Sequence, residues 1–328
     1  MKKSKLITIP AAAVAVDFAF TGFVLEEIMS HKPLVYPKVS KFLMKKFDAK
    51  NKSQEAEKPA EKNLKLEENC KWFETAVNEE IVMTNSVGLK LQGYYYPADK
   101  PSKVIVVCCH GYTSCGKNDY GSKAKFWHDM NYNVFMVDHR CHGKSEGQWI
   151  GFGYHECHDT LEWLDFLKAR FGDDVEFVLH GISMGSATVM MMSGADNLPE
   201  NVKCTVADCG YTSCRNELKH GLNNLVHMPD FPFLYTADII NKKINGYHFN
   251  DANPLERVKK AKVPILFIHG GNDIYVPTKM GYELYEACCR DDKELFIVPG
   301  AGHTESHSVD TLGYEKRATE FAAKYVNP

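Results

Sequence analysis

The chain lacks the sequence patterns of several common protein classes. It has no C-x-x-C pair and no Lys/Arg stripe interleaved with aromatic residues, and its net charge is only −3. Without a ligand spacing the usual zinc sites are excluded, and the weak charge predicts no nucleic-acid partner. No internal repeat is visible, and the sequence gives no cofactor signal or sign of oligomeric state. We therefore predict a protein without metal or cofactor.

Eleven cysteines are present, an odd number. Cys108-Cys109 falls in an apolar run typical of a strand, where neighbouring side chains point to opposite faces. Such a pair suits packing better than a shared disulfide, so we expect reduced thiols used as small apolar residues. With 44% hydrophobic and 25% charged residues, the composition is that of an ordinary globular protein.

The N-terminus differs from the rest of the chain. Three lysines within the first five residues precede an apolar stretch at 6–25, long enough for a bilayer span. This pattern predicts a membrane anchor with the rest of the chain outside the cytoplasm. Pro10 and the charge of Asp17 oppose it. Two alternatives stay open: cleavage of a signal peptide near Ala13-Val14-Ala15, and a cytoplasmic protein in which this stretch docks as a helix.

The chain divides into three expected parts. Residues 1–30 form the apolar segment, and residues 31–75 are a charged linker with helix. Residues 76–328 form the main domain. Within it, residues 212–262 interrupt the strand pattern and predict a small helical cap, of the kind that shapes a substrate pocket.

The main domain alternates between apolar runs and helical stretches. Two runs, 80–84 and 89–96, flank a turn at 85–88 and predict an antiparallel hairpin. Six further apolar runs follow, at residues 104–109, 134–137, 176–179, 204–207, 265–268 and 294–298. Continuous apolar strands separated by helices, of which 155–171 is the clearest, predict a mostly parallel central sheet flanked by helices.

The most specific motif is Gly181-Ile182-Ser183-Met184-Gly185, which follows an apolar run and precedes the small and methionine-rich run 187–192. Strand, tight turn and helix form the setting of a nucleophile elbow. Glycines two positions either side of the serine relieve the steric strain of that turn. We expect an exposed Ser183 hydroxyl at a helix N-terminus.

A serine hydroxyl needs a base, and parallel sheets gather their reactive loops at the carboxyl ends of the strands. Two later loops end there in Asp273 and His303. Taken singly, Asp273 fits a helix cap and His303 is one of fourteen histidines. Together with Ser183 they have the chain order serine, aspartate, histidine, which predicts a catalytic triad.

From about residue 79 to 326 the chain resembles an α/β-hydrolase of the serine-hydrolase superfamily. It is most similar to the bacterial esterase/aminopeptidase-like branch, whose members often carry an N-terminal apolar segment. The motifs that carry the resemblance are His110-Gly111-Tyr112, Asp138-His139-Arg140-Cys141-His142-Gly143-Lys144-Ser145, Gly181-Ile182-Ser183-Met184-Gly185, His269-Gly270-Gly271-Asn272-Asp273 and Gly300-Ala301-Gly302-His303. The implied fold is the α/β-hydrolase fold.

The resemblance also implies further roles. The backbone N–H groups of Tyr112 and Met184 would form the oxyanion hole. Asp138 and Arg140 would belong to the structural turn beside the nucleophile. One departure stands out, because many relatives have glycine where this chain has Ser186.

The expected activity is hydrolysis of a carboxylic ester of a small substrate through an acyl-enzyme. Candidate pocket residues are Trp149, Phe152, Tyr211, Phe231 and Phe233. The same triad serves an aminopeptidase or amidase, or acyl transfer to an acceptor other than water. A non-catalytic binding protein on a hydrolase fold is the alternative from another class.

Overall fold

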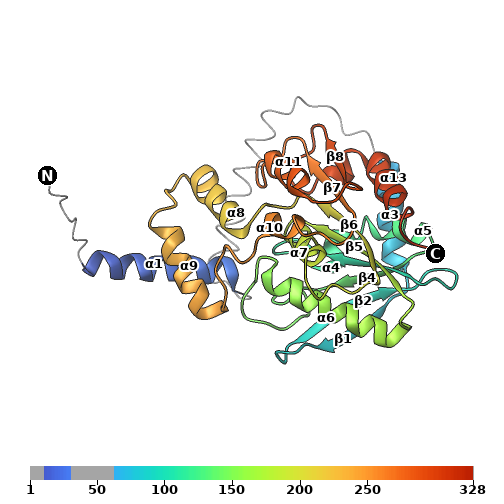
Figure 1. The fold of residues 1–328 in the computed structure, drawn as a ribbon, viewed down its shortest axis with the longest axis horizontal. Coiled ribbons are helices and arrows are strands. Elements are labelled where there is room, and N and C mark those ends of the chain that lie inside the picture. The colour runs from blue at the N-terminus through green and yellow to red at the C-terminus, as the bar shows by residue number, and fades with distance from the viewer. Residues whose placement is uncertain (1–10, 31–62, 328) are drawn as a thin grey trace.

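An eight-stranded sheet forms the centre of the computed structural model, which describes residues 11–30 and 63–327 (Figure 1). The spatial order is β1-β2-β4-β3-β5-β6-β7-β8. β1 (Glu79–Thr84) and β2 (Lys90–Tyr96) form the predicted hairpin, and β2 also pairs with β4 in antiparallel fashion. The remaining pairs are parallel, among β3 (Val104–Cys109), β4 (Asn133–Val137), β5 (Glu176–Ile182), β6 (Val202–Asp208), β7 (Ile265–Gly270) and β8 (Glu294–Val298). The predicted sheet is confirmed.

Helices cover both faces of the sheet, which explains why its central strands are apolar throughout. One face packs against α6 (Tyr154–Phe171), α7 (Met184–Ser193), α10 (Pro254–Val258) and α11 (Thr278–Ala287). The other packs against α4 (Gly116–Tyr120), α5 (Ala124–Asp129) and α13 (Thr311–Ala322). Cys108 and Cys109 belong to opposite faces, as expected. All eleven cysteines are free and most are buried.

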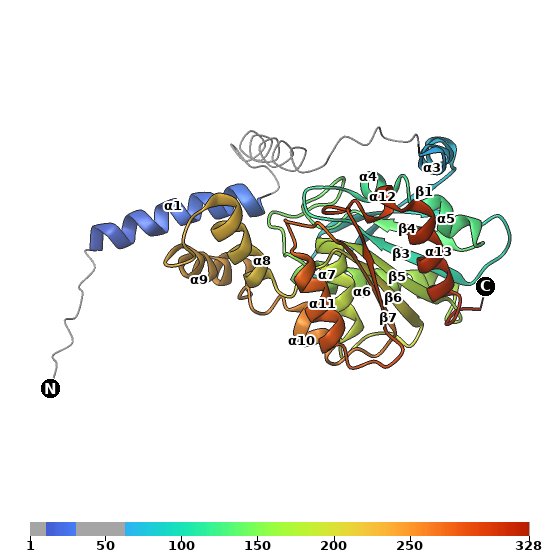
Figure 2. The ribbon, with the colours of Figure 1, turned by 90° about the horizontal axis from the view of Figure 1, so that it is seen from above.

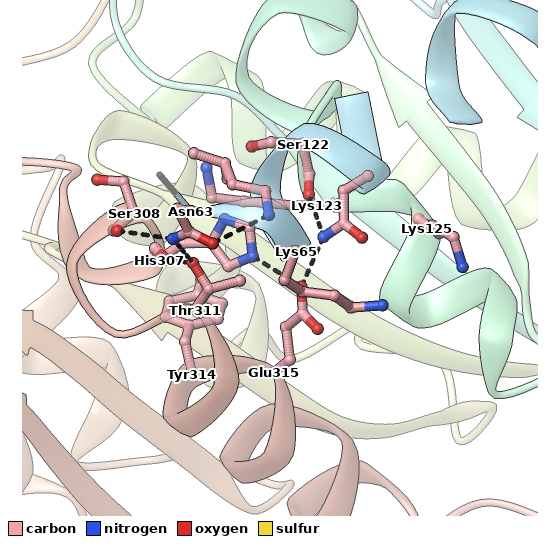
Figure 3. A network of polar contacts seen from close by, with 12 residues as sticks. Asn63, Lys65, Ser122, Lys123, Lys125, His307, Ser308, Thr311, Tyr314 and Glu315 are labelled. Carbon is pink, nitrogen blue, oxygen red and sulfur yellow. Dashed lines mark hydrogen bonds and ion pairs between the residues drawn. The ribbon is translucent and has the colours of Figure 1, made fainter. Parts of the chain in front are cut away.

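Helix α3 (Leu64–Thr75) joins the second face through buried polar contacts (Figure 3). The Asn69 side-chain amide donates to the Glu315 carboxylate at 2.6 Å and to the Ser122 carbonyl at 3.0 Å. His307, on the short helix α12 (Ser306–Val309), lies 3.1 Å from the same carboxylate oxygen. The expected charged linker therefore ends in a docked helix, while residues 31–62 lie outside the described part.

The segment 212–262 is helical, as predicted for a cap. It contains α8 (Cys214–His220), the π-helix η1 (Gly221–Val226) and α9 (Phe233–Asn245), while α10 at its end returns to the core. Figures 1 and 2 show α8 and α9 projecting from the sheet, with α1 (Ala11–Met29) beside α9. We call α1, α8, η1 and α9 the roof.

Helix α1 is attached to α9 and to the main domain by hydrogen bonds. The Thr236 hydroxyl of α9 donates to Asp17 at 2.5 Å. At the other end of α1, the Ile28 carbonyl accepts the Tyr112 hydroxyl at 2.6 Å, and the Met29 carbonyl accepts a backbone N–H at 2.8 Å. Asp17, the residue that opposes a bilayer span, thus has a partner inside the protein.

Across residues 11–30 and 63–327, no helix has both the length and the apolar character that crossing a bilayer requires. The start of the predicted span, residues 6–10, lies outside the described part of the chain.

Candidate active site

The nucleophile elbow forms where β5 ends and α7 begins. Ser183 has φ +55°, a conformation that L-residues adopt at a cost of about 1–3 kcal/mol. A Cβ on Gly181 would collide with the Gly185 carbonyl, and one on Gly185 would collide with the Cys109 carbonyl. Both glycines are therefore required by the close approach of backbone segments, as the motif predicts.

Ser183 is less accessible than expected from sequence, since only 9% of its surface is exposed. The loop after β3 lies against it, and a Cβ on Gly111 would come within 3.4 Å of the Ser183 Cβ. The backbone N–H of Ser183 donates to the Asp208 carbonyl at 2.9 Å, which ties the elbow to the end of β6.

The structure brings the three predicted polar residues together. Ser183 Oγ lies 2.9 Å from His303 Nε2, and His303 Nδ1 lies 2.7 Å from Asp273 Oδ2. Because a carboxylate only accepts, Nδ1 carries the ring proton and Nε2 is left to accept from the serine. The line of contacts has the geometry of a serine-hydrolase triad.

Asp273 serves two structural purposes at once. While Oδ2 faces His303, Oδ1 accepts the backbone N–H groups of Tyr275 and Val276, each at 3.0 Å. Burial alone would raise the pKa of Asp273, but hydrogen bonds from His269 and His303 outweigh it and the pKa is lowered. The carboxylate is therefore held in its charged form.

His269 also contacts Asp273, a contact that was not predicted from the sequence. It is the first residue of the loop motif that ends in Asp273. Its Nε2 donates to the Val276 carbonyl at 2.9 Å and lies 3.4 Å from Asp273 Oδ2. Burial would lower the pKa of His269, but the neighbouring Asp273 raises it above the usual value. The sequence signal for this contact is that His269 lies four residues before Asp273 in the same loop motif.

Tyr112 and Met184, the candidates for the oxyanion hole, come together beside Ser183. Both pack in a small cluster with Cys141 and Ile150. Met184 is the first residue of α7, and the first N–H groups of a helix have no partner within it. The Met184 N–H thus lies at the start of the helix that follows the nucleophile.

The candidate pocket residues do not all meet. Phe152 stacks on Tyr112 with ring centroids 5.4 Å apart, and Trp149 packs in one apolar cluster with both. The Tyr211 hydroxyl donates to the Phe152 carbonyl at 2.9 Å. Phe231, by contrast, is 63% exposed and contacts Tyr235. Phe233 is partly exposed at the start of α9. Sequence alone could not separate the buried from the exposed aromatics among these candidates.

The residues expected to be structural have structural contacts. Asp138 accepts the backbone N–H groups of Gly116 at 2.9 Å and Lys144 at 3.0 Å. Arg140 forms a bidentate pair with Asp159, each bond 2.6 Å long. These bonds fix the turn after β4.

Among the described residues, one group of side chains offers three potential metal ligands close together. It comprises Cys209, Asp273 and His303, whose ligand atoms lie within 4.8 Å of one another. Asp273 and His303 already bond to each other, and burial raises the pKa of the Cys209 thiol well above its usual value. These three side chains therefore suit a hydrogen-bonded triad better than a metal site.

Comparisons with known proteins identify the family of the chain. The model of the prolyl oligopeptidase family matches residues 118–328. YqkD of Bacillus subtilis (strain 168) is 30% identical over 253 residues, covering 76% of this chain and 80% of that protein.

Two further likenesses are weaker. The lysophosphatidylserine lipase ABHD12 of Macaca fascicularis is 27% identical over 220 residues, covering 63% of this chain and 52% of that protein. The Pyrococcus furiosus esterase Pf2001 superposes with TM-score 0.64 at 22% identity, over 77% of this chain and 93% of that one, and this likeness shows the fold. The chain is a hydrolase of the prolyl oligopeptidase family, built on the α/β-hydrolase fold.

Proposed function

We propose that this hydrolase cleaves a carboxylic ester of a small substrate through an acyl-enzyme on Ser183. The observation that carries the proposal is the continuous line from Ser183 Oγ through His303 to Asp273, with contacts of 2.9 and 2.7 Å. A strained serine aligned in this way is the arrangement of nucleophilic catalysis, in which an adjacent base activates a weak hydroxyl.

The reaction follows from the protonation states. His303 Nε2 takes the proton from Ser183 Oγ as the oxygen attacks the substrate carbonyl carbon. The carbonyl oxygen gains negative charge and accepts the backbone N–H groups of Tyr112 and Met184. The C–O bond then breaks, and His303 returns the proton to the departing alcohol. Water attacks the acyl-enzyme with the same proton transfers, which release the acid and restore the serine.

Asp273 stabilises the charged imidazole and keeps its Nδ1 protonated. It does not need to accept the proton itself. The lowered pKa of Asp273 supports this role, because a carboxylate that stays ionised favours the imidazolium formed in the transition state.

An apolar acyl group suits the side chains near Ser183 best. Tyr112, Phe152 and Trp149 belong to one apolar cluster under the roof, together with Leu25 and Met29 of α1. Apolar and aromatic walls with few polar groups are typical of small-molecule sites. The esterase and lipase likenesses point the same way.

An aminopeptidase or amidase activity is the second candidate, and Glu217 in the roof favours it. Its Oε2 is buried without a hydrogen-bond partner in the described part of the chain. Burial, and then the charge of Asp273, raise the pKa of Glu217 well above its usual value. A substrate ammonium group would pair with such a carboxylate. Hydrolysis of aminoacyl amides that falls in Glu217→Gln, with ester hydrolysis unchanged, would identify this alternative.

A fluorophosphonate probe tests the proposal directly, since it forms a covalent bond with an activated serine. We expect labelling of the wild type and none of Ser183→Ala, together with loss of p-nitrophenyl ester hydrolysis. Ser186→Ala is the matched control, because its buried Oγ has no hydrogen-bond partner among the described residues and its loss should be nearly neutral. An unlabelled wild type would favour the non-catalytic binding protein.

We also propose that the N-terminal segment makes contact with a membrane, with the catalytic domain outside the cytoplasm. Phe18 and Phe23 of α1 are 41% and 46% exposed, which supports contact with an apolar surface. Fractionation of cells carrying the full chain or a chain without residues 1–30 tests it. Unchanged recovery in the soluble fraction would reject the contact and favour the cytoplasmic alternative.

A further inference from the structure

The loop that carries Tyr112 is held by a hydrogen bond to His142, which lies in the turn after β4. The backbone N–H of Thr113 donates to His142 Nε2 at 3.1 Å. Thr113 has φ +57°, a left-handed conformation that needs support from its surroundings. His142 therefore stabilises the one strained residue next to the candidate oxyanion donor.

The hydrogen bonds of His142 define its tautomer. Its Nδ1 lies 2.8 Å from the Arg140 carbonyl, which only accepts, so Nδ1 carries the proton and Nε2 is a bare acceptor. Burial, and then the nearby His110, lower the pKa of His142 to about 4. The ring is thus neutral near pH 7, as acceptance of the Thr113 N–H requires.

A second histidine fixes the preceding peptide plane. His110 Nε2 accepts the His139 N–H at 3.0 Å, so His110 Nδ1 is the donor toward the Gly111 carbonyl, 2.6 Å away. In a trans peptide the carbonyl and the following N–H point in opposite directions. Fixing the Gly111 carbonyl therefore fixes the direction of the Tyr112 N–H, and His142 fixes the next plane.

The position of the His142 ring is itself determined by its turn. Cys141 and Gly143 on either side have φ +65° and +54°. A Cβ on Gly143 would collide with the Asp138 carboxylate, which binds the backbone of the turn. The ring also contacts His110, with centroids 4.9 Å apart. The acceptor atom is thus held rigidly beneath the loop.

We propose that His142 is a positioning residue for the oxyanion hole: its neutral ring accepts the Thr113 N–H and holds the Tyr112–Thr113 peptide, which keeps the adjoining Tyr112 N–H in its productive orientation. This role rests on the proposed esterase function, in which Tyr112 donates to the oxyanion. Small displacements of such donors are costly, because a shift of about 1 Å lowers rates by roughly a hundredfold.

Two substitutions distinguish the hydrogen-bonding role of His142 from a role in packing alone. In His142→Gln the side-chain oxygen reaches the place of Nε2 and still accepts, whereas in His142→Asn a polar atom remains only near the place of Nδ1. We expect kcat on p-nitrophenyl butyrate to fall roughly 10- to 100-fold in His142→Asn, with KM within about threefold. His142→Gln should retain most of the wild-type kcat.

Binding of a trifluoromethyl ketone provides a second readout, because its adduct with Ser183 carries an oxyanion. We expect its affinity to fall in His142→Asn in parallel with kcat/KM. The control is His128→Asn, which removes a histidine that also contacts a carbonyl, that of Pro97 at 3.0 Å, away from the site. Equal activity of the Asn and Gln variants, whether full or reduced, would overturn the proposal.

If His142→Asn fails to fold, the kcat of His142→Gln still tests the positioning role. Loss of more than about tenfold in its kcat, in a folded protein, would contradict a role for the acceptor atom. The proposed esterase function is tested separately. Ester hydrolysis by Ser183→Ala at the wild-type rate would reject that function, regardless of the results for the His142 variants. An inactive Ser183→Ala with a fully active His142→Asn would reject only the positioning role.

Discussion

The loops that carry Ser183, Asp273 and His142, here called the lower part, and the roof are held together by different forces. The lower part is held by partly buried hydrogen bonds of defined direction, as at Ser183, Asp273 and His142. The roof is held mainly by apolar packing, and it leaves large side chains such as Tyr235 and Ile239 about half exposed. Hydrogen bonds depend steeply on geometry, whereas apolar contacts tolerate movement. The geometry of the loops around Ser183 is therefore more tightly constrained than the packing of the roof.

The largest effect should come from reversing one hydrogen bond in the lower part. In Asp273→Asn the side-chain oxygen can still accept from Tyr275 and Val276, but the amide faces His303 as a donor and favours the wrong tautomer. We expect kcat to fall about 10⁴-fold with little change in thermal stability. Steady-state kinetics and a melting curve measure both.

The matched control is Asp174→Asn, which removes a solvent-exposed carboxylate paired with Lys103. It should leave kcat unchanged, because surface ion pairs contribute little. An active Asp273→Asn enzyme would mean that the carboxylate only caps its turn.

The hydrogen bond at His142 should make the stability of the protein depend on pH. Burial and His110 lower the pKa of His142 to about 4, against the opposing effects of the Arg140 carbonyl, Glu156 and Asp138. Since the unfolded pKa is about 6.5, the unfolded chain binds the proton first as pH falls. Stability from this group is complete above about pH 6.5 and declines toward pH 4. We expect a loss of about 2 kcal/mol between pH 8 and pH 5.

Urea unfolding at the two pH values measures that loss in the wild type and in His142→Gln, which has no ring to protonate. The variant should lose about 2 kcal/mol less than the wild type over this interval. Identical pH dependence of the two proteins would show that His142 is not a neutral buried group.

The smallest effect should follow from loosening the roof. Thr236→Val removes the donor to Asp17, while Thr236→Ser retains it. We expect faster hydrogen exchange in α1 of the valine variant, a stability loss of about 1 kcal/mol and kcat within about threefold of wild type. A large fall in kcat in the valine variant alone would mean that the roof, too, controls the reaction.

Much of the lower part could be predicted because its signals are local. β3 and β8 have the expected bounds, and the glycines around Ser183 identified the elbow. Local patterns could not predict the contact of His269 with Asp273 or the exposed position of Phe231. Whether an aromatic in the roof faces inward depends on helix packing, which no short motif records.

The sequence by itself determined the alternation of strands and helices, the strained serine turn and the order of the three polar residues, since each depends on neighbours in the chain. Only the tertiary structure decided where α1 lies and which atoms of His142 and His303 carry protons. Tyr112 and Ile28 are 84 residues apart, and Asp17 and Thr236 are 219 apart. A tautomer is set by the partner that a ring nitrogen meets, and that partner is chosen by the packed fold.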